Sequence, residues 1–378
     1  MERRDFGKTG FKVSILSLGG FHLLEVGRRD ASRIVNRYLD LGGNYVETAA
    51  QYGNGNSERK IGEVLKTRRE ECFLTTKCHL RTKREAEKTL ERSLRNLQTD
   101  HVDLVLIHHL STYEELAQVQ SLDGAFAALD DARKAGKIRF IGVSGHGHPE
   151  LLKKALETLP LDAVMVETNY YDRFNFPRTQ VELIPFAARH KMAVIGMKAV
   201  GDGFLWQSWE KAFRYAWSLP VSTVVAGMNT LKMVEQDVAL AESFKPMTSE
   251  EVESLFLEAP ELGNYVCRQC GKCLPCPVNI DIPTVFLCEG LYDRQMRDEI
   301  IRDPPEFALR DRLRFWFDNQ QRAAEEYEKL SPKADACTKC GECVPRCPYK
   351  LPIIEKLEVT HSKLTEEIKT LGATTLAW

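Results

Sequence analysis

The chain has 378 residues, of which 43% are hydrophobic and 28% charged, and its formal net charge is −2. This length suggests about two or three domains, or one large barrel with a smaller module. The near-zero charge excludes a strongly basic or acidic surface as a reason to expect nucleic acid or an anionic membrane as partner. No stretch approaches the roughly 20 apolar residues of a membrane span, and the N-terminus lacks the apolar core of a signal peptide. We therefore expect a cytoplasmic protein, in which disulfides are rare.

Short apolar runs alternate with helical patterns through residues 1–245. The expected strands, in chain order, are 14–19, 44–48, 72–77, 102–108, 138–145, 163–168, 193–198 and 222–227. The expected helices after them are 31–42, 57–67, 84–98, 123–136, 149–159, 178–190, 209–219 and 231–242. Strand–helix units repeated in this way are typical of an α/β fold of the (β/α)8 TIM-barrel type. The strands are continuously apolar, as expected when both faces of a sheet are buried.

Polar residues stand where several of these strands end, which is where TIM barrels carry their chemistry. Glu47, Lys77 and His108 close the second, third and fourth strands, and Tyr52 lies on the loop after Glu47. Further strand-closing polar residues are Ser144, Glu167, Asn169 and Lys198. Tyr52 is the expected general acid, because a phenol can protonate a carbonyl oxygen as hydride arrives. We expect buried Lys77 to lower the pKa of Tyr52, Glu47 to keep the lysine charged, and His108 to help fix the carbonyl.

Eight of the eleven cysteines fall into two groups of four. The groups are Cys267, Cys270, Cys273 and Cys276, and Cys337, Cys340, Cys343 and Cys347. Three thiolates spaced by two residues can wrap one iron–sulfur cube, and a more distant Cys-Pro commonly supplies the fourth ligand to the other cube. The spacing therefore predicts two 4Fe–4S clusters with crossed ligation, in which Cys347 completes the first triad and Cys276 the second. A single cluster and structural zinc are the alternatives, although zinc sites use two cysteine pairs and no histidine lies inside either motif.

The remaining cysteines, Cys72, Cys78 and Cys288, are expected to be buried as small apolar residues. The sequence between the two cysteine groups has a helical pattern, so we expect a small, mainly helical ferredoxin-like domain over 246–351. A C-terminal helix and tail should follow over 352–378.

Six strings in residues 1 to about 241 resemble the aldo-keto reductase family. They are RRDFGKTGFKVSILSLG, NYVETAAQYGNGNSERKIGEVL, TTK, HVDLVLIHHL, IRFIGVSG and VAGMNTLKMVEQD. Within that family the chain is most similar to a branch with a two-motif ferredoxin-like tail. The resemblance implies a TIM-barrel oxidoreductase that uses NADP(H) or NAD(H). It maps the family's Asp, Tyr, Lys and His tetrad onto Glu47, Tyr52, Lys77 and His108, with glutamate replacing aspartate.

The same resemblance indicates nucleotide-binding positions, several of which depart from the family pattern. Ser144 and Gly145 fall where the carboxamide is bound, and glycine replaces the usual asparagine. Met165 and Met197 stand in place of a glutamine and of the aromatic residue that stacks on the nicotinamide. The segment near the pyrophosphate maps onto Gly227, Met228, Asn229, Gln236 and Asp237. The methionines are equally consistent with core packing.

Three functions follow from this combination. In the first, an NAD(P)H-dependent enzyme reduces a small carbonyl or oxidises an alcohol, and its clusters are structural or redox-sensing. In the second, an iron–sulfur oxidoreductase couples a ferredoxin or another electron-transfer protein to the substrate. In the third, the barrel is non-catalytic and serves in interaction. A nicotinamide moves two electrons as hydride whereas each cluster moves one, so direct exchange between them is poor. The sequence does not identify the substrate.

Overall fold

The computed structural model describes residues 1–296 and 317–366, and these form two compact units. The barrel unit comprises Met1–Thr168, Arg178–Ala199 and Glu210–Pro246, and the cysteine unit comprises Asn169–Pro177, Val200–Trp209 and the chain from Met247 onward. The sequence predicted a division between residues 241 and 248. It gave no sign that the loops following two barrel strands, 169–177 and 200–209, group with the C-terminal part.

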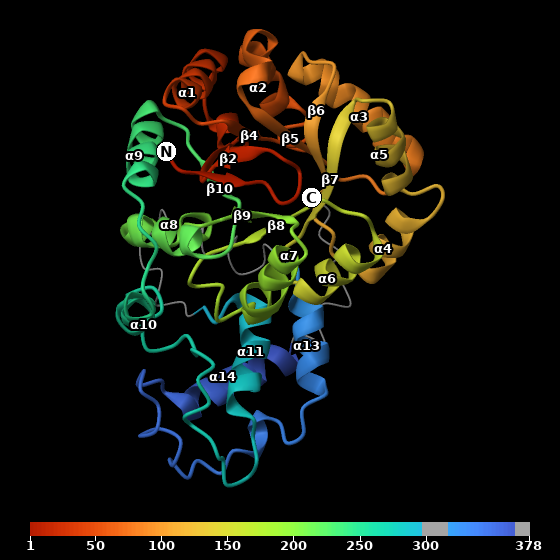
Figure 1. Ribbon diagram of the computed structural model, residues 1–378. Coiled ribbons are helices and arrows are strands. Elements are labelled where there is room, and N and C mark those ends of the chain that lie inside the picture. The colour runs from red at the N-terminus through yellow and green to blue at the C-terminus, as the bar shows by residue number, and fades with distance from the viewer. Residues whose placement is uncertain (297–316, 367–378) are drawn as a thin grey trace. The chain divides into compact units, whose positions relative to one another are not determined.

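The barrel unit contains a closed barrel of eight parallel strands, which confirms the predicted TIM-barrel fold (Figure 1). Its strands are β3 (Leu16–Gly19), β4 (Tyr45–Glu47), β5 (Phe73–Cys78), β6 (Val102–Ile107), β7 (Ile138–Ser144), β8 (Ala163–Glu167), β9 (Ala193–Met197) and β10 (Thr223–Gly227). Pairing of β10 with both β9 and β3 closes the barrel. Every residue of β5, β6, β8 and β9 is buried. This burial explains why these strands are continuously apolar in the sequence.

Helices surround these strands (Figure 1) and follow the predicted order. They are α1 (Arg28–Asp40), α2 (Asn56–Arg68), α3 (Lys83–Leu97), α5 (Ala125–Lys134), α6 (Pro149–Thr158), α7 (Ile184–Arg189), α8 (Trp209–Ser218) and α9 (Leu231–Glu242). The helix expected over 178–190 begins instead with a π-helical turn over Thr179–Leu183. The sequence interpretation missed α4 (Tyr113–Gln120), an eight-residue helix whose N-cap Thr112 accepts a hydrogen bond from the Glu115 backbone N–H.

An N-terminal hairpin that was not predicted covers the bottom of the barrel. Its strands β1 (Arg3–Asp5) and β2 (Lys12–Ser14) have three residues each, too few to give a periodic pattern. The hairpin brings Phe6 and Phe11 against Phe73 at the start of β5, with ring centroids 4.6 and 5.3 Å apart. Aromatic contacts of this kind bury a large apolar area. The N-terminal ends of the strands are thus closed, and the C-terminal ends remain for chemistry.

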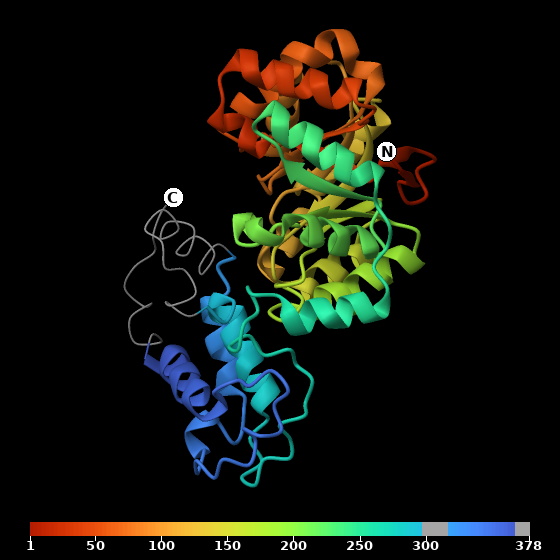
Figure 2. The same cartoon turned by 90° about the vertical axis from the view of Figure 1, so that its left-hand side faces the viewer.

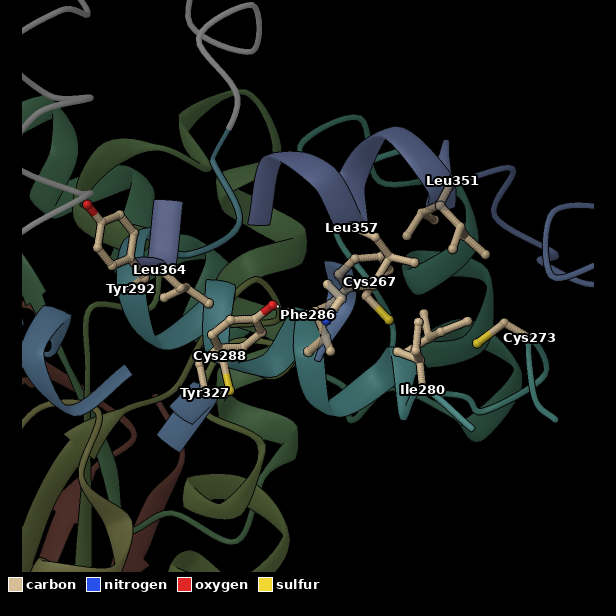
Figure 3. Close-up of a cluster of buried hydrophobic side chains, with 14 of the residues drawn as sticks. Cys267, Cys273, Ile280, Phe286, Cys288, Tyr292, Tyr327, Leu351, Leu357 and Leu364 are labelled. Atoms are coloured by element: carbon tan, nitrogen blue, oxygen red, sulfur yellow. Dashed lines mark hydrogen bonds between the residues drawn. The ribbon is translucent and has the colours of Figure 1, made fainter. Parts of the chain in front are cut away.

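The cysteine unit is mainly helical, as predicted. Its described helices are α10 (Ser249–Glu258), α11 (Ile282–Asp293), α13 (Gln320–Glu328) and α14 (Ile353–Glu366). Figure 2 shows α11, α13 and α14 packed together, and Figure 3 shows the apolar core between them. Most of the helical stretch predicted between the two cysteine groups lies outside the described residues. The C-terminal tail also lies outside them. Within the described part of the chain, no helix is long and apolar enough to cross a membrane.

Candidate active site and cluster sites

The barrel brings Glu47, Tyr52, Lys77 and His108 together at the C-terminal ends of its strands. Glu47 ends β4, Lys77 lies near the end of β5, His108 follows β6, and Tyr52 lies on the turn before α2. Lys77 Nζ donates hydrogen bonds to Tyr52 Oη over 2.8 Å and to the Thr48 carbonyl over 3.1 Å. Lys77 and Glu47 also form an ion pair, and their side chains are only 2% and 3% exposed. The lysine ammonium therefore joins the carboxylate to the phenol.

Glutamate serves at position 47 without losing the lysine contact. The sequence left open whether the added methylene would misplace the carboxylate, since small displacements can cost a large factor in rate. Glu47 Oε1 contacts Lys77 and lies 3.5 Å from Tyr52 Oη, at the limit of a hydrogen bond. The longer side chain thus reaches the same partners from the end of its strand.

Burial controls the protonation of this group. It raises the pKa of Tyr52 well above the ordinary value. The expectation that Lys77 would lower the pKa of Tyr52 is therefore wrong, because desolvation of the phenolate dominates. Burial also lowers the pKa of Lys77 well below its ordinary value, and the positive charge of Lys198 lowers it further. Tyr52 consequently keeps its proton. The Lys77 ammonium, in contrast, is a stronger acid than it would be in water.

His108 is a neutral imidazole beside the tyrosine. Its ring meets the Tyr52 ring edge-on, with centroids 5.8 Å apart. Burial, and then the charge of Lys77, lower the pKa of His108 well below its usual range. Among the described residues His108 Nδ1 has no hydrogen-bond partner, which leaves the ring available to a ligand.

Two cations that sequence reasoning left without a role support this site. Arg81 Nη2 donates to the His108 and His109 carbonyls over 2.9 and 2.8 Å and pairs with Glu115 at 3.1 Å. It holds the turn in which His109 adopts a left-handed φ of 51°, unusual for a non-glycine residue. Lys198 follows β9 with a φ of 55° and acts electrostatically on Lys77. A single basic residue in a loop carries no pattern that could have signalled either role.

The eight clustered cysteines line two cavities in the cysteine unit. The first cavity is lined by Cys267, Cys270, Cys273 and Cys347 among other residues. The second is lined by Cys276, Cys337, Cys340 and Cys343 among other residues. These sets match the crossed grouping that the spacing predicts, and Ile282 lines both cavities. In the described chain no three His, Cys, Asp or Glu side chains converge on one point as for a single metal ion.

The difference in length between the two cysteine motifs has a structural counterpart. Arg346 is the extra residue before the last cysteine of the second motif, and its Nη1 donates to the Pro275 carbonyl of the first motif over 2.8 Å. Gly271 and Gly341 occupy equivalent turn positions with φ of 70° and 81°, which favour glycine. The two loops therefore share one geometry, and Arg346 ties them together.

The lone cysteines are buried, as expected. Figure 3 shows Cys288 well apart from Cys267 and Cys273 within the same apolar core. Cys288 lines neither cavity.

A buried network of polar side chains that contacts Cys267 was not predicted. Gln295 accepts a hydrogen bond from the Cys267 backbone N–H over 2.7 Å and donates to Asn175 Oδ1 over 3.2 Å. Arg294 pairs with Asp172 at 3.0 Å, and the two side chains are only 2% and 1% exposed. Arg294 and Gln295 both have a left-handed φ, of 60° and 55°. Such strain persists only where surrounding contacts impose it. The contacts with Asp172 and Asn175 join residues more than a hundred positions apart, which a sequence pattern cannot reveal.

Comparison with known proteins agrees with the barrel site and with the two cysteine-lined cavities. The model of the Aldo/keto reductase family matches residues 16–252, more than half of the chain. The chain belongs to the aldo/keto reductase family. A model described as a 4Fe-4S dicluster domain matches residues 266–352, which span both cysteine groups. The predicted combination of an aldo/keto reductase barrel with a C-terminal 4Fe–4S dicluster domain is thus confirmed.

Relatives whose names state an activity match about two thirds of this aldo/keto reductase. The L-galactose dehydrogenase of Arabidopsis thaliana is 26% identical over 304 residues, which are 68% of this chain and 94% of that protein. The pyridoxal 4-dehydrogenase of Microbacterium luteolum is 26% identical over 309 residues, which are 68% of this chain and 88% of that protein. A solved aldo-keto reductase of Bacillus halodurans, in its holo form, has a TM-score of 0.59 and 26% identity, covering 67% of this chain and 94% of that one.

The residues predicted to contact a nicotinamide lie on or just after neighbouring strands. Ser144 ends β7 and pairs in register with Met165 of β8, and Met197 ends β9. Met165 and Met197 belong to the buried apolar core of the barrel. A Cβ added at Gly145 would lie 2.9 Å from a Leu152 methyl group and 3.0 Å from the Leu110 carbonyl. A side chain at this position would therefore crowd the Leu110 carbonyl and displace the Leu152 methyl group.

The segment predicted to lie near a pyrophosphate leads from a strand to the N-terminus of a helix. Residues 227–230 connect β10 to the N-terminus of α9, where Thr230 accepts a hydrogen bond from the Met233 backbone N–H. A helix N-terminus favours a bound anion. Gln236 is exposed on α9, whereas Asp237 is only 7% exposed. Burial raises the pKa of Asp237 to about 7.

The crossed cysteine grouping predicts the result of removing one sulfur. In Cys347→Ala we expect the cluster of the first cavity to be lost and that of the second retained, so that iron and sulfide content fall by about half. The measurement is chemical analysis of iron and sulfide in anaerobically purified full-length protein. Cys288→Ala is the matched control and should keep its iron. Full iron content in Cys347→Ala would contradict the grouping.

The buried Asp237 carboxyl predicts a pH-dependent stability. Because its folded-state pKa is raised above the unfolded value, the stability it contributes is present below about pH 4 and is lost as pH rises through about 7. Asp237→Asn should therefore match the wild type in acid and be more stable above pH 7, by up to roughly 4 kcal/mol. Urea unfolding at several pH values measures this difference. Equal stability at pH 8 would mean that the carboxylate is solvated or paired.

Proposed function

We propose that the barrel unit reduces a small carbonyl compound, or oxidises the corresponding alcohol, by hydride transfer with Tyr52 as the general acid. The observation that carries the proposal is the 2.8 Å contact between Tyr52 Oη and Lys77 Nζ, backed by the buried carboxylate of Glu47. The proposal includes two 4Fe–4S clusters, bound by the cysteines that line the two cavities.

NADPH or NADH would supply the hydride when bound. The residues that would hold the nicotinamide are Ser144, Gly145, Met165 and Met197. Those near the pyrophosphate would be Gly227, Met228, Asn229, Gln236 and Asp237. Gly145 would contribute backbone only, and the two methionines would offer an apolar, polarizable surface to the ring.

Tyr52 suits the role of proton donor because its raised pKa keeps it protonated at neutral pH. As the carbonyl carbon accepts hydride, negative charge grows on the carbonyl oxygen, and the phenol gives its proton to that oxygen. The tyrosinate left behind lies beside the Lys77 ammonium. An interaction that strengthens as charge develops accelerates the reaction. Because burial lowers the pKa of Lys77, this ammonium can also return a proton to the tyrosinate.

His108 would orient the substrate. A neutral imidazole can donate one N–H to the carbonyl oxygen without competing with Tyr52 as an acid. Arg81, through the backbone after His108, would keep the ring in place.

Electron transfer to a partner protein is a second candidate function for the cysteine unit. Cys270 and Cys340 are exposed, so one ligand of each proposed cluster reaches the surface. A ferredoxin-like one-electron donor could approach both clusters there. If clusters reduced with dithionite are reoxidised by a carbonyl substrate in the absence of nicotinamide, this second function is supported.

Replacing the tyrosine hydroxyl tests the proposed reduction. In Tyr52→Phe, kcat for NAD(P)H-dependent reduction of an aldehyde should fall by roughly 10²- to 10⁴-fold, because the general acid is gone. Iron content should not change, since Tyr52 is remote in the chain from the cysteine unit. Tyr113→Phe, which alters a tyrosine that is 50% exposed, is the control and should keep full activity. Unchanged turnover in Tyr52→Phe would refute the assignment.

The direction of the Tyr52 pKa shift adds a pH profile to this test. With a raised pKa the phenol stays protonated, so deprotonation of Tyr52 should cause no fall in the rate of reduction between about pH 6 and about pH 9. A decline in that range would report loss of the proton from Lys77, whose pKa burial lowers.

A further inference from the structure

The two cysteine-lined cavities differ in the charges around them. Arg268 lines the first cavity and is only 6% exposed. No lysine, arginine, aspartate or glutamate of the described chain lines the second cavity. The cavities also differ in exposure, since Cys267 and Cys273 are buried whereas Cys337 and Cys343 are partly exposed.

The Arg268 guanidinium is buried but not neutralised. It donates hydrogen bonds to four backbone carbonyls, of Phe256, Leu262, Gly263 and Val266. Its Cζ also lies 4.6 Å from the ring centroid of Tyr349, another residue that lines the first cavity. Carbonyls satisfy its N–H groups without cancelling its charge, and no described carboxylate lies within ion-pair distance. A guanidinium is not deprotonated in proteins, so Arg268 stays positive at neutral pH.

Lys356 supplies a second positive charge on the same side. It is completely buried, and its Nζ lies 3.7 Å from the ring centroid of Tyr265 and 4.8 Å from that of Phe286, which lines the first cavity. Lys356 forms an ion pair with Glu289. Lys356 Nζ therefore lies against a side chain that lines the first cavity.

The charges beside the second cavity are paired and in contact with water. Lys339 pairs with Glu358 at 2.5 Å, with side chains 65% and 53% exposed, and Arg346 pairs with Glu342 at 2.9 Å. Such pairs have little net effect on a neighbouring group, because the charges cancel and solvent screens them.

We propose that these charges make the two sites unequal, so that a single electron added to the protein resides on the cluster held by Cys267, Cys270, Cys273 and Cys347. Reduction adds one negative charge to a cluster, and net charge and exposure set its potential. Burial of Cys267 and Cys273 alone would disfavour that charge. The same low dielectric, however, strengthens the attraction of the unneutralised Arg268, so the cation outweighs the burial.

The electron balance is internal to the protein. One electron leaves a singly reduced cluster at the second site, which returns to its oxidised 2+ core. The electron enters the oxidised cluster at the first site, whose core becomes 1+. No proton or bond changes hands. The inference rests on the proposed ligation of two clusters.

The test is a dithionite titration of anaerobic full-length protein, followed by electron paramagnetic resonance, after iron analysis has established two clusters. The wild type should show two separate one-electron steps. In Arg268→Gln the higher-potential step should move down by at least the 59 mV that corresponds to a tenfold change in a one-electron equilibrium. The lower-potential step should stay in place.

Two further variants keep the test decisive. Lys272→Gln removes the same charge from an exposed position in the same loop, so it should shift neither step appreciably. Lys356→Gln should lower the same step as Arg268→Gln, and it serves if Arg268→Gln does not assemble its clusters.

The outcomes separate this inference from the proposed function. Two clusters with one common potential in the wild type would overturn it, as would a variant that moves only the lower step or an equal shift in Lys272→Gln. Absence of iron from the purified protein would instead refute the proposed clusters themselves.

Discussion

The buried ammonium of Lys77, held between Glu47 and Tyr52, is the interaction on which the barrel's chemistry depends. An unpaired charge in such a position would be strongly destabilising, and a pair offsets that cost only with close geometry. Strands β4 and β5 supply this geometry by ending side by side, with Glu47 in register with Thr75. The same burial that makes the pair costly keeps the proton on Tyr52. Stability and catalysis therefore set the same requirement, which is a dry, closed barrel end.

The cysteine unit is built differently, because cysteines that we propose as cluster ligands are part of its apolar core. Cys267 and Cys273 pack among apolar side chains, and buried Glu289 accepts hydrogen bonds from Tyr265 over 2.9 Å and from Lys363 over 2.8 Å. When a ligand site forms only in the folded state, binding free energy becomes folding free energy. Clusters would thus stabilise this unit whether or not they carry electrons in turnover. The hydride transfer that we propose for the barrel would move electrons in pairs, so the two units would act on separate redox steps.

Local patterns revealed most of the fold but only part of the site. The barrel strands and helices repeat often enough to be predicted, whereas three-residue strands such as β1 give no periodicity. The cysteine motifs could be recognised in the sequence because their spacing decides which sulfurs can bind one cluster. Arg81, Gln295 and Arg268 were not, because their roles arise from contacts that no spacing encodes. The pKa of Tyr52 was mispredicted for a related reason, since burial depends on the whole barrel.

We propose above all that hydride passes within the barrel from a nicotinamide to a carbonyl carbon. The most direct measurement uses NADPH or NADH deuterated at the hydride position, with an aldehyde substrate in ordinary water. We expect deuterium on the carbinol carbon of the alcohol product and a solvent-derived proton on its oxygen. An alcohol whose carbon carries hydrogen from water would contradict it, because the electrons would then have travelled by another route.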